Sequence, residues 1–283
     1  MRAFTIIFLL FLTFSGFSQI QTPQPSPSSK LEQMVGLTDI EINYNRPSKR
    51  GRVIFGNLVP FGELWRTGAN SNSTISFSTD VEIGEEKINK GTYSIFSVPN
   101  EDYWDFILYS DSDLWGVPQD WDNKKIVHKS RHNSHHLNSE KELETFTISL
   151  NNISNNDANL VIAWGDRYIK VTIDVPTRMM VDSNIESVMN GSPKASDYYA
   201  SAVYYRQENI KLDVALEWIN KAMEMTEDPK FYQLRQQSLI MAANGNYKDA
   251  VNVAKKSLEL SVKADNQDYV KMNNDSIKEW SKK

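Results

Sequence analysis

Apolar residues alternate with polar ones in short runs from about residue 29 to residue 175. A period of two is typical of a strand that buries one of its faces. Turn clusters such as residues 71–73 and 155–157 separate the runs, and no long helical pattern lies between them. Short strands without crossover helices pair antiparallel, so residues 29–175 are predicted to form a sandwich or barrel, and we favour the antiparallel β-sandwich. Nine or ten strands are expected, with a single helix at 124–136 as the alternative.

The apolar period changes to that of a helix in the rest of the chain. Apolar residues fall three and four positions apart at 212–223, and the same spacing recurs 35 positions later at 247–258. Helix pairs with a period of about 34 residues are typical of tetratricopeptide repeats, which this region resembles. We therefore predict an all-α, tetratricopeptide-like helical-repeat domain at residues 195–283, joined to the β domain by a weakly patterned linker at residues 176–194.

The first residues have the pattern of a secretory signal peptide at residues 1–18. Arg2 supplies a positive start, residues 3–14 are nearly all apolar, and Ser18 ends a small-residue cleavage site. An apolar run of about 12 residues is well below the roughly 20 that cross a bilayer, although a retained anchor is the alternative. We expect cleavage near Ser18, a periplasmic or secreted protein, no membrane span after cleavage, and a Pro/Ser-rich linker at residues 19–28.

Composition narrows the chemistry further. The chain has no cysteine, which excludes disulfides, thiol chemistry and lipidation on an N-terminal cysteine. The formal charge is −5 and becomes −6 once Arg2 leaves with the signal peptide, so no global basic field exists and nucleic-acid binding is not expected. A hydrophobic content of 40% with 11% aromatic residues is enough for real cores, which predicts a globular protein.

Residues 45–70 carry an unusual density of charge and backbone punctuation, with five cations, two prolines, four glycines and Trp65. Ordinary connections are about 4–6 residues long, and longer ones are often functional. The candidate ligand-binding residues are Arg46, Arg52, Trp65, Arg66 and Asn70. Guanidinium forks and a flat aromatic face suit a carboxylate, a phosphate or a sugar. The structural alternative is that Trp65 fills the core while the arginines hold the long loop together.

The same segment resembles a known family. Its pattern reads Arg46-Pro47, Gly51-Arg52-x-Ile54-Phe55-Gly56, Leu58-Val59-Pro60-x-Gly62 and Trp65-Arg66-x-Gly68-Ala69-Asn70, with residues 91–96 and Trp115-Gly116 further on. These motifs are similar to those of domain-of-unknown-function family 2911, a family of secreted bacterial proteins. The resemblance covers roughly residues 29–175 and implies an exported β-rich domain, sometimes followed by helical repeats, without an established activity. The sequence departs from the family at 126–136, where a histidine-rich piece replaces an arginine-containing strand.

All four histidines lie within that piece, at His128, His132, His135 and His136. Imidazole is the commonest side-chain metal ligand, and a helix would place all four on one face. The neighbours are typical of a loop or strand, however, and no glutamate stands in a zincin frame. A solvated loop is the favoured interpretation, with metal binding as the alternative.

Aspartates interleave with aromatic residues between positions 102 and 122. Paired carboxylates among aromatics are what a glycosidase uses, and oxygen ligands are what calcium prefers. Asp111-Ser112-Asp113 lacks the rest of a calcium loop, so surface turns are the favoured interpretation. The residues of this set are Asp102, Asp105, Asp111, Asp113, Asp120 and Asp122.

The sequence contains no cofactor fingerprint and no Gly-x-Ser-x-Gly motif. We therefore expect no cofactor and a non-enzymatic ligand-binding or scaffold protein, with a glycan or peptide as the ligand of the β domain. The concave face of a repeat array suits a protein partner, and its candidate residues are Tyr198, Tyr205, Gln233 and Gln236. Buried tyrosines would instead attach the array to the β-sandwich. The alternative function is a cell-envelope hydrolase that acts on glycan or peptide.

Overall fold

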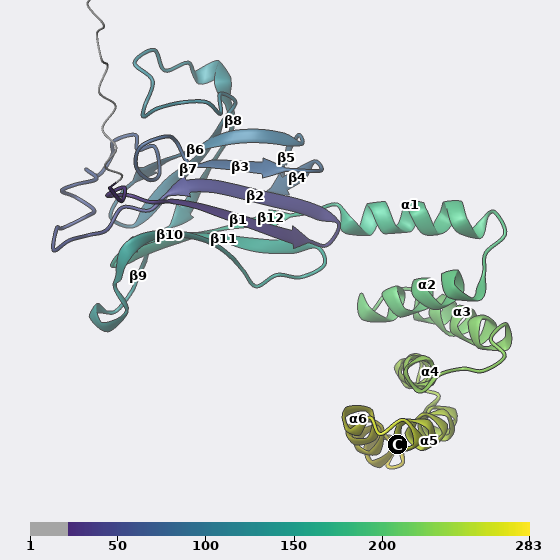
Figure 1. Cartoon of the computed structure of the whole chain (residues 1–283). Helices are drawn as coiled ribbons and strands as arrows, with labels where there is room; N and C mark the ends of the chain where they lie inside the picture. The colour runs from purple at the N-terminus through teal and green to yellow at the C-terminus, as the bar shows by residue number, and fades with distance from the viewer. Residues whose placement is uncertain (1–21) are drawn as a thin grey trace, which may run out of the picture. The chain divides into compact units, whose positions relative to one another are not determined.

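The structure is a computed structural model that describes residues 22–283. The chain divides into two compact units, Met1–Thr177 and Arg178–Lys283. The first unit is built from antiparallel β-sheets and the second from helices, which confirms the predicted fold class (Figure 1). The predicted signal peptide lies outside the described residues and stays a prediction.

Two antiparallel sheets form the β unit. The first has the strand order β1-β2-β3-β6-β7-β8, with bounds Ser28–Val35, Thr38–Asn45, Thr74–Phe77, Gly91–Pro99, Tyr103–Tyr109 and Ile126–Asn133. The second has the order β10-β11-β12-β4-β5, with bounds Leu143–Asn151, Asp157–Gly165, Arg167–Asp174, Val81–Ile83 and Glu86–Ile88. The two-residue strand β9, His135–His136, also pairs with β12.

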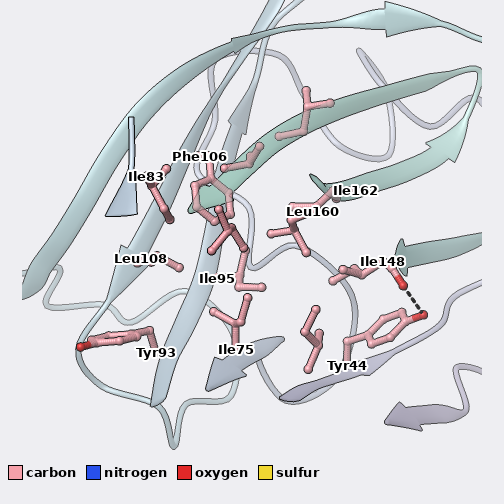
Figure 2. Packing of buried hydrophobic residues seen from close by; sticks show 14 of the residues in the cluster. Tyr44, Ile75, Ile83, Tyr93, Ile95, Phe106, Leu108, Ile148, Leu160 and Ile162 are labelled. Atoms are coloured by element: carbon pink, nitrogen blue, oxygen red, sulfur yellow. Dashed lines mark hydrogen bonds between the residues drawn. The ribbon is translucent and has the colours of Figure 1, made fainter. Parts of the chain in front are cut away.

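The core of this unit lies between the inward faces of the two sheets. Ile95 and Phe106 from the first sheet and Leu160 and Ile162 from the second belong to one buried cluster (Figure 2). Burial of such side chains contributes about 1.5–3 kcal/mol each relative to leaving them exposed. The Tyr44 hydroxyl donates a 3.1 Å hydrogen bond to the main-chain carbonyl of Ile148, which links β2 to β10 across the sheets (Figure 2).

Twelve strands occur in the described residues, where nine or ten were expected. Strands β4, β5 and β9 have only two or three residues, which is too few to show an alternation of apolar and polar residues. The helix considered at 124–136 is wrong, because a short 3-10 turn, Asn123–Lys125, leads directly into strand β8. Histidines rather than aliphatic residues occupy the inward positions of β8, so its period of two is hidden from an apolar pattern.

The second unit contains six helices: α1 Thr177–Met189, α2 Ala195–Gln207, α3 Leu212–Glu224, α4 Phe231–Ala243, α5 Tyr247–Lys263 and α6 Gln267–Trp280. Helix α1 lies in the segment expected to be a linker. Helices α2 and α3 pack on each other, as do α4 and α5, with α6 packed on α5. Fully buried alanines such as Ala215 and Ala254 lie within these packed helices, where a small side chain lets helices approach closely. Within residues 22–283, no helix combines the length and apolar character needed to cross a membrane.

Candidate functional site

The long segment between β2 and β3 encloses a hollow of about 520 Å³ on the β unit. Most of its lining comes from residues 47–69, and Pro25, Ser26, Val117 and Trp164 complete it. The segment predicted from its charge and glycine content to form a site is therefore the one that builds this hollow.

The segment is held in place by its own apolar residues and by a strand neighbour. Ile54, Phe55 and Val59 are buried in the main core of the β unit. The main chain of Trp65 exchanges two hydrogen bonds with Ser97 of β6, at 2.8 and 2.9 Å. These anchors fix the loop on a rigid sheet, which is how proteins commonly position binding groups.

Arg66 lines the hollow with part of its guanidinium unpaired. The side chain is half-buried, and its Nε is buried without a hydrogen-bond partner. A Cβ atom on Gly116 would lie 3.3 Å from Arg66 Nη1, so this glycine (φ +94°) gives the guanidinium its space. An unsatisfied buried donor costs about 1–3 kcal/mol, so the guanidinium of Arg66 is not fully paired within the described part of the chain.

Two further arginines line the hollow, Arg50 and Arg52. Arg50 Nη2 donates to the Pro25 carbonyl at 3.2 Å, and Arg52 donates to the carbonyls of Ser48 and Lys49 at 2.7 and 2.9 Å. These neutral acceptors orient both guanidinium groups without cancelling their charge. Three arginines face one carboxylate, Glu63, in the described lining, so the hollow favours an anion.

Trp65 also lines the hollow, but most of its ring packs inside the protein. The indole makes edge contacts with Phe55, Trp104 and Phe146, and it stacks on Trp164 at 6.2 Å between ring centroids. Its Nε1 donates to the Gly68 carbonyl at 3.2 Å. Trp65 is therefore a wall of the site and a part of the core at once.

Arg46 and Asn70, also predicted as ligand-binding residues, do not line the hollow. Arg46 donates to the Phe146 carbonyl at 3.1 Å and to Thr147 Oγ1 at 2.9 Å. Asn70, with a φ of +58°, donates to the Ser26 carbonyl at 3.3 Å. Both hold the loop in place, so the structural alternative describes these two residues. Arg50 was not predicted as a ligand-binding residue, but it lines the hollow and belongs to the same five-cation segment.

Two of the histidines are joined through one serine on strand β8, where a solvated loop was expected. His128 is only 4% exposed; its Nδ1 lies 2.6 Å from Glu86 Oε2, and its Nε2 lies 2.8 Å from Ser130 Oγ. The same Ser130 oxygen lies 2.7 Å from His132 Nε2. Carboxylate, imidazole and hydroxyl follow one another as in serine hydrolases, but here two imidazoles share the hydroxyl. Glu86 lies 42 positions before His128, and no sequence motif predicts that the two side chains are in contact.

Burial lowers the pKa of His132, the charge of His128 lowers it further, and a hydrogen bond to the main chain of Lys170 opposes both effects. The other two histidines lie elsewhere: His135 stacks on Tyr168, and His136 Nδ1 lies 3.6 Å from Asp166. Across residues 22–283, no three side chains of metal-ligating type are grouped so that they could hold an ion.

The aspartates between 102 and 122 take structural roles where contacts are seen. Burial raises the pKa of Asp105, but ion pairs with Arg131 at 2.8 Å and Lys129 at 3.3 Å outweigh it and the net pKa is lowered. Asp111 pairs with Lys125, and Asp122 caps the turn that precedes β8. None of these aspartates lines the hollow.

The fold and the site together define a two-unit protein whose β-sandwich carries an arginine-lined hollow. The chain belongs to the family described as protein of unknown function (DUF2911), which matches residues 26–173, just over half of the chain. This match confirms the resemblance drawn from the loop motifs, and it includes every residue of the hollow's lining except Pro25. No curated protein and no solved structure matches the chain.

Proposed function

We propose that the protein is a non-enzymatic binding protein whose β unit holds a carboxylate-bearing glycan fragment or peptide in the arginine-lined hollow. The observation that carries this proposal is Arg66, whose buried Nε has no partner in a hollow where three arginines outnumber one glutamate. Arginine presents a planar fork of donors that matches a carboxylate in two hydrogen bonds.

The size and lining of the hollow suit such a ligand. Its volume of about 520 Å³ falls within the range of small-molecule sites, roughly 300–1,000 Å³. Leu58, Val117 and Trp164 add apolar walls beside the guanidinium groups. A sugar acid or a short peptide with a free carboxyl terminus offers apolar faces together with a carboxylate. A simple inorganic anion offers no apolar face.

The proposal also takes the protein to be exported, in the periplasm or outside the cell, where such fragments occur. In the helical unit, two packed helix pairs followed by a terminal helix support a tetratricopeptide-like array that binds a protein partner. The hydrolase alternative gains nothing from the hollow, because glycoside hydrolysis needs two carboxylates and Glu63 is the one carboxylate of the described lining.

The test is thermal unfolding of residues 19–283 with matched pairs of ligands: glucuronate against glucose, and a dialanine peptide with a free against an amidated carboxyl terminus. The acidic member of a pair should stabilise the chain, by about 2.7 kcal/mol at 100 times its dissociation constant. Arg66→Gln should abolish the shift. Equal shifts within each pair, or a response to inorganic phosphate alone, would contradict the proposed ligand class.

A further inference from the structure

The helical unit contains two half-buried arginines, Arg206 and Arg235. Burial lowers the pKa of Arg206 on α2 and of Arg235 on α4, and the charge of Arg206 lowers the pKa of Arg235 further. The two guanidinium groups are therefore close enough to repel each other. No aspartate or glutamate contributes to the shift of either pKa.

Neither guanidinium is saturated with hydrogen bonds. Arg206 Nε is buried without a partner. Arg235 Nη1 donates a 2.9 Å hydrogen bond to Ser276 Oγ of α6, and its guanidinium carbon lies 5.8 Å from the centre of the Trp280 ring. Buried cations are normally neutralised by an anion. The hydroxyl of Ser276 and the ring of Trp280 are neutral, so the positive charge of Arg235 is not cancelled by them.

Tyrosines from the same three helices surround these arginines. Tyr199 precedes Arg206 by seven positions on α2 and so shares its face, and burial raises the pKa of Tyr199 to about 12. Tyr232 of α4 and Tyr269 of α6 also act on Tyr199, while α4 contacts both α2 and α6. We call this set the arginine–tyrosine patch: Tyr199, Arg206, Tyr232, Arg235 and Tyr269.

We propose that the arginine–tyrosine patch binds a carboxylate of an acidic segment of a protein partner. Two guanidinium groups without a counter-ion are complementary to one carboxylate, and binding would remove both the repulsion and the unpaired donor. The tyrosine rings provide walls for peptide side chains.

Two residues predicted for the concave face of this unit have structural roles. Tyr205 is 3% exposed and stacks on Trp218 at 5.5 Å, so it staples α2 to α3. Gln233 caps α4 by accepting from the Lys230 N–H at 2.9 Å. The inference deepens the proposed partner binding of the helical unit, and it is independent of the hollow in the β unit.

Fluorescence anisotropy of residues 19–283 with a labelled peptide tests the inference. The probe is an eight-residue peptide of alternating Glu and Leu, and its control replaces each Glu by Gln. The acidic peptide should bind and the control should not. Arg206→Gln and Arg235→Gln should each weaken binding by about tenfold. Arg66→Gln should leave the affinity unchanged, whereas loss of binding in that variant would move the peptide to the hollow and overturn this inference.

Thermal unfolding separates a binding role from a structural one. Arg206→Gln removes one of two repelling charges and should leave the unfolding midpoint unchanged or raise it, whereas a lowered midpoint would mean that Arg206 holds the helices together and would overturn the inference. Arg206→Lys keeps the charge without the fork and should bind more weakly than the natural chain but better than Arg206→Gln. Equal binding of the Gln-containing peptide, unchanged binding in both Gln variants, or binding of inorganic phosphate without binding of the acidic peptide would each overturn the inference.

Discussion

Two arginines of the same loop, Arg46 and Arg66, show how much a residue's role depends on contacts far away in sequence. Arg46 uses its Nε and Nη2 on acceptors of strand β10, 100 and 101 positions away. Arg66 keeps a buried Nε free of any partner. The motif predicted that both belong to one region, but only the fold separates the residue that braces the loop from the one that keeps an unpaired donor, which we propose binds the ligand.

This difference predicts opposite results for two alanine variants. Arg46→Ala removes two hydrogen bonds and leaves acceptors unpaired, so the free energy of unfolding should fall by about 1–3 kcal/mol. Arg66→Ala removes an unsatisfied donor and should change it by less than about 0.5 kcal/mol. Urea denaturation of both variants measures this. A loss at Arg66 as large as that at Arg46 would place Arg66 in the scaffold.

Gly116 provides a second test of the role of Arg66 in ligand binding. Its φ of +94° and the 3.3 Å between a Cβ there and Arg66 Nη1 mean that Gly116→Ala strains the backbone and pushes the guanidinium. Gly84, in the turn between β4 and β5, has a φ of +64° and no heavy atom within 4 Å of such a Cβ. Both variants should lose about 1 kcal/mol of stability. Calorimetric titration with glucuronate should show weaker binding for Gly116→Ala alone, and equal weakening in Gly84→Ala would remove Gly116 from the site.

Strand β8 and helix α1 are two elements that the pattern of apolar residues did not predict. Strand β8 keeps a period of two, but its inward positions include His128 and His132, which contact Ser130 of the same strand and also Glu86 of β5 and Lys170 of β12. Helix α1 carries a sparse stripe, Val181 and Ile185, that joins the helical core. Aliphatic alternation and dense helical stripes were sufficient to predict the sheets and the later helices. An element whose inward face is polar, as in β8, or carries few apolar residues, as in α1, was not predicted, because the residues that stabilise it come from other elements.

The half-buried His132 of β8 predicts a pH dependence of stability. The pKa of His132 in the folded chain lies below its ordinary value of 6.5. As the pH falls below about 6.5, the unfolded chain binds a proton there before the folded chain does, so the free energy of unfolding falls; above that pH the group has no effect. His132→Gln should remove this part of the dependence between pH 8 and pH 5, as followed by denaturation at each pH. The exposed His135→Gln is the control, and an identical pH profile for both variants would contradict the prediction.

Within the whole molecule, the division into two units places the two proposed sites on separate cores. The hollow is lined entirely by residues between Pro25 and Trp164, and the main core of its unit ends at Val175. The helical clusters draw on residues from Val181 onward. A compact unit with its own core is expected to fold alone, so each site should survive removal of the other unit.

The contacts of Thr177, at the boundary between the units, allow the independence of the β unit to be tested by truncation. Thr177 Oγ1 accepts a 3.3 Å hydrogen bond from the Leu37 N–H, and it sits so close to Gly36 that a Cβ there would lie 1.8 Å away. Residues 22–177 should therefore unfold cooperatively and show the same glucuronate-induced shift as residues 19–283. Residues 22–175 lose this contact at the β1–β2 turn and should unfold a few degrees earlier, with ligand binding intact because the hollow is elsewhere. Loss of the ligand response in residues 22–177 would mean that the hollow depends on the helices, and the two sites would then be one system.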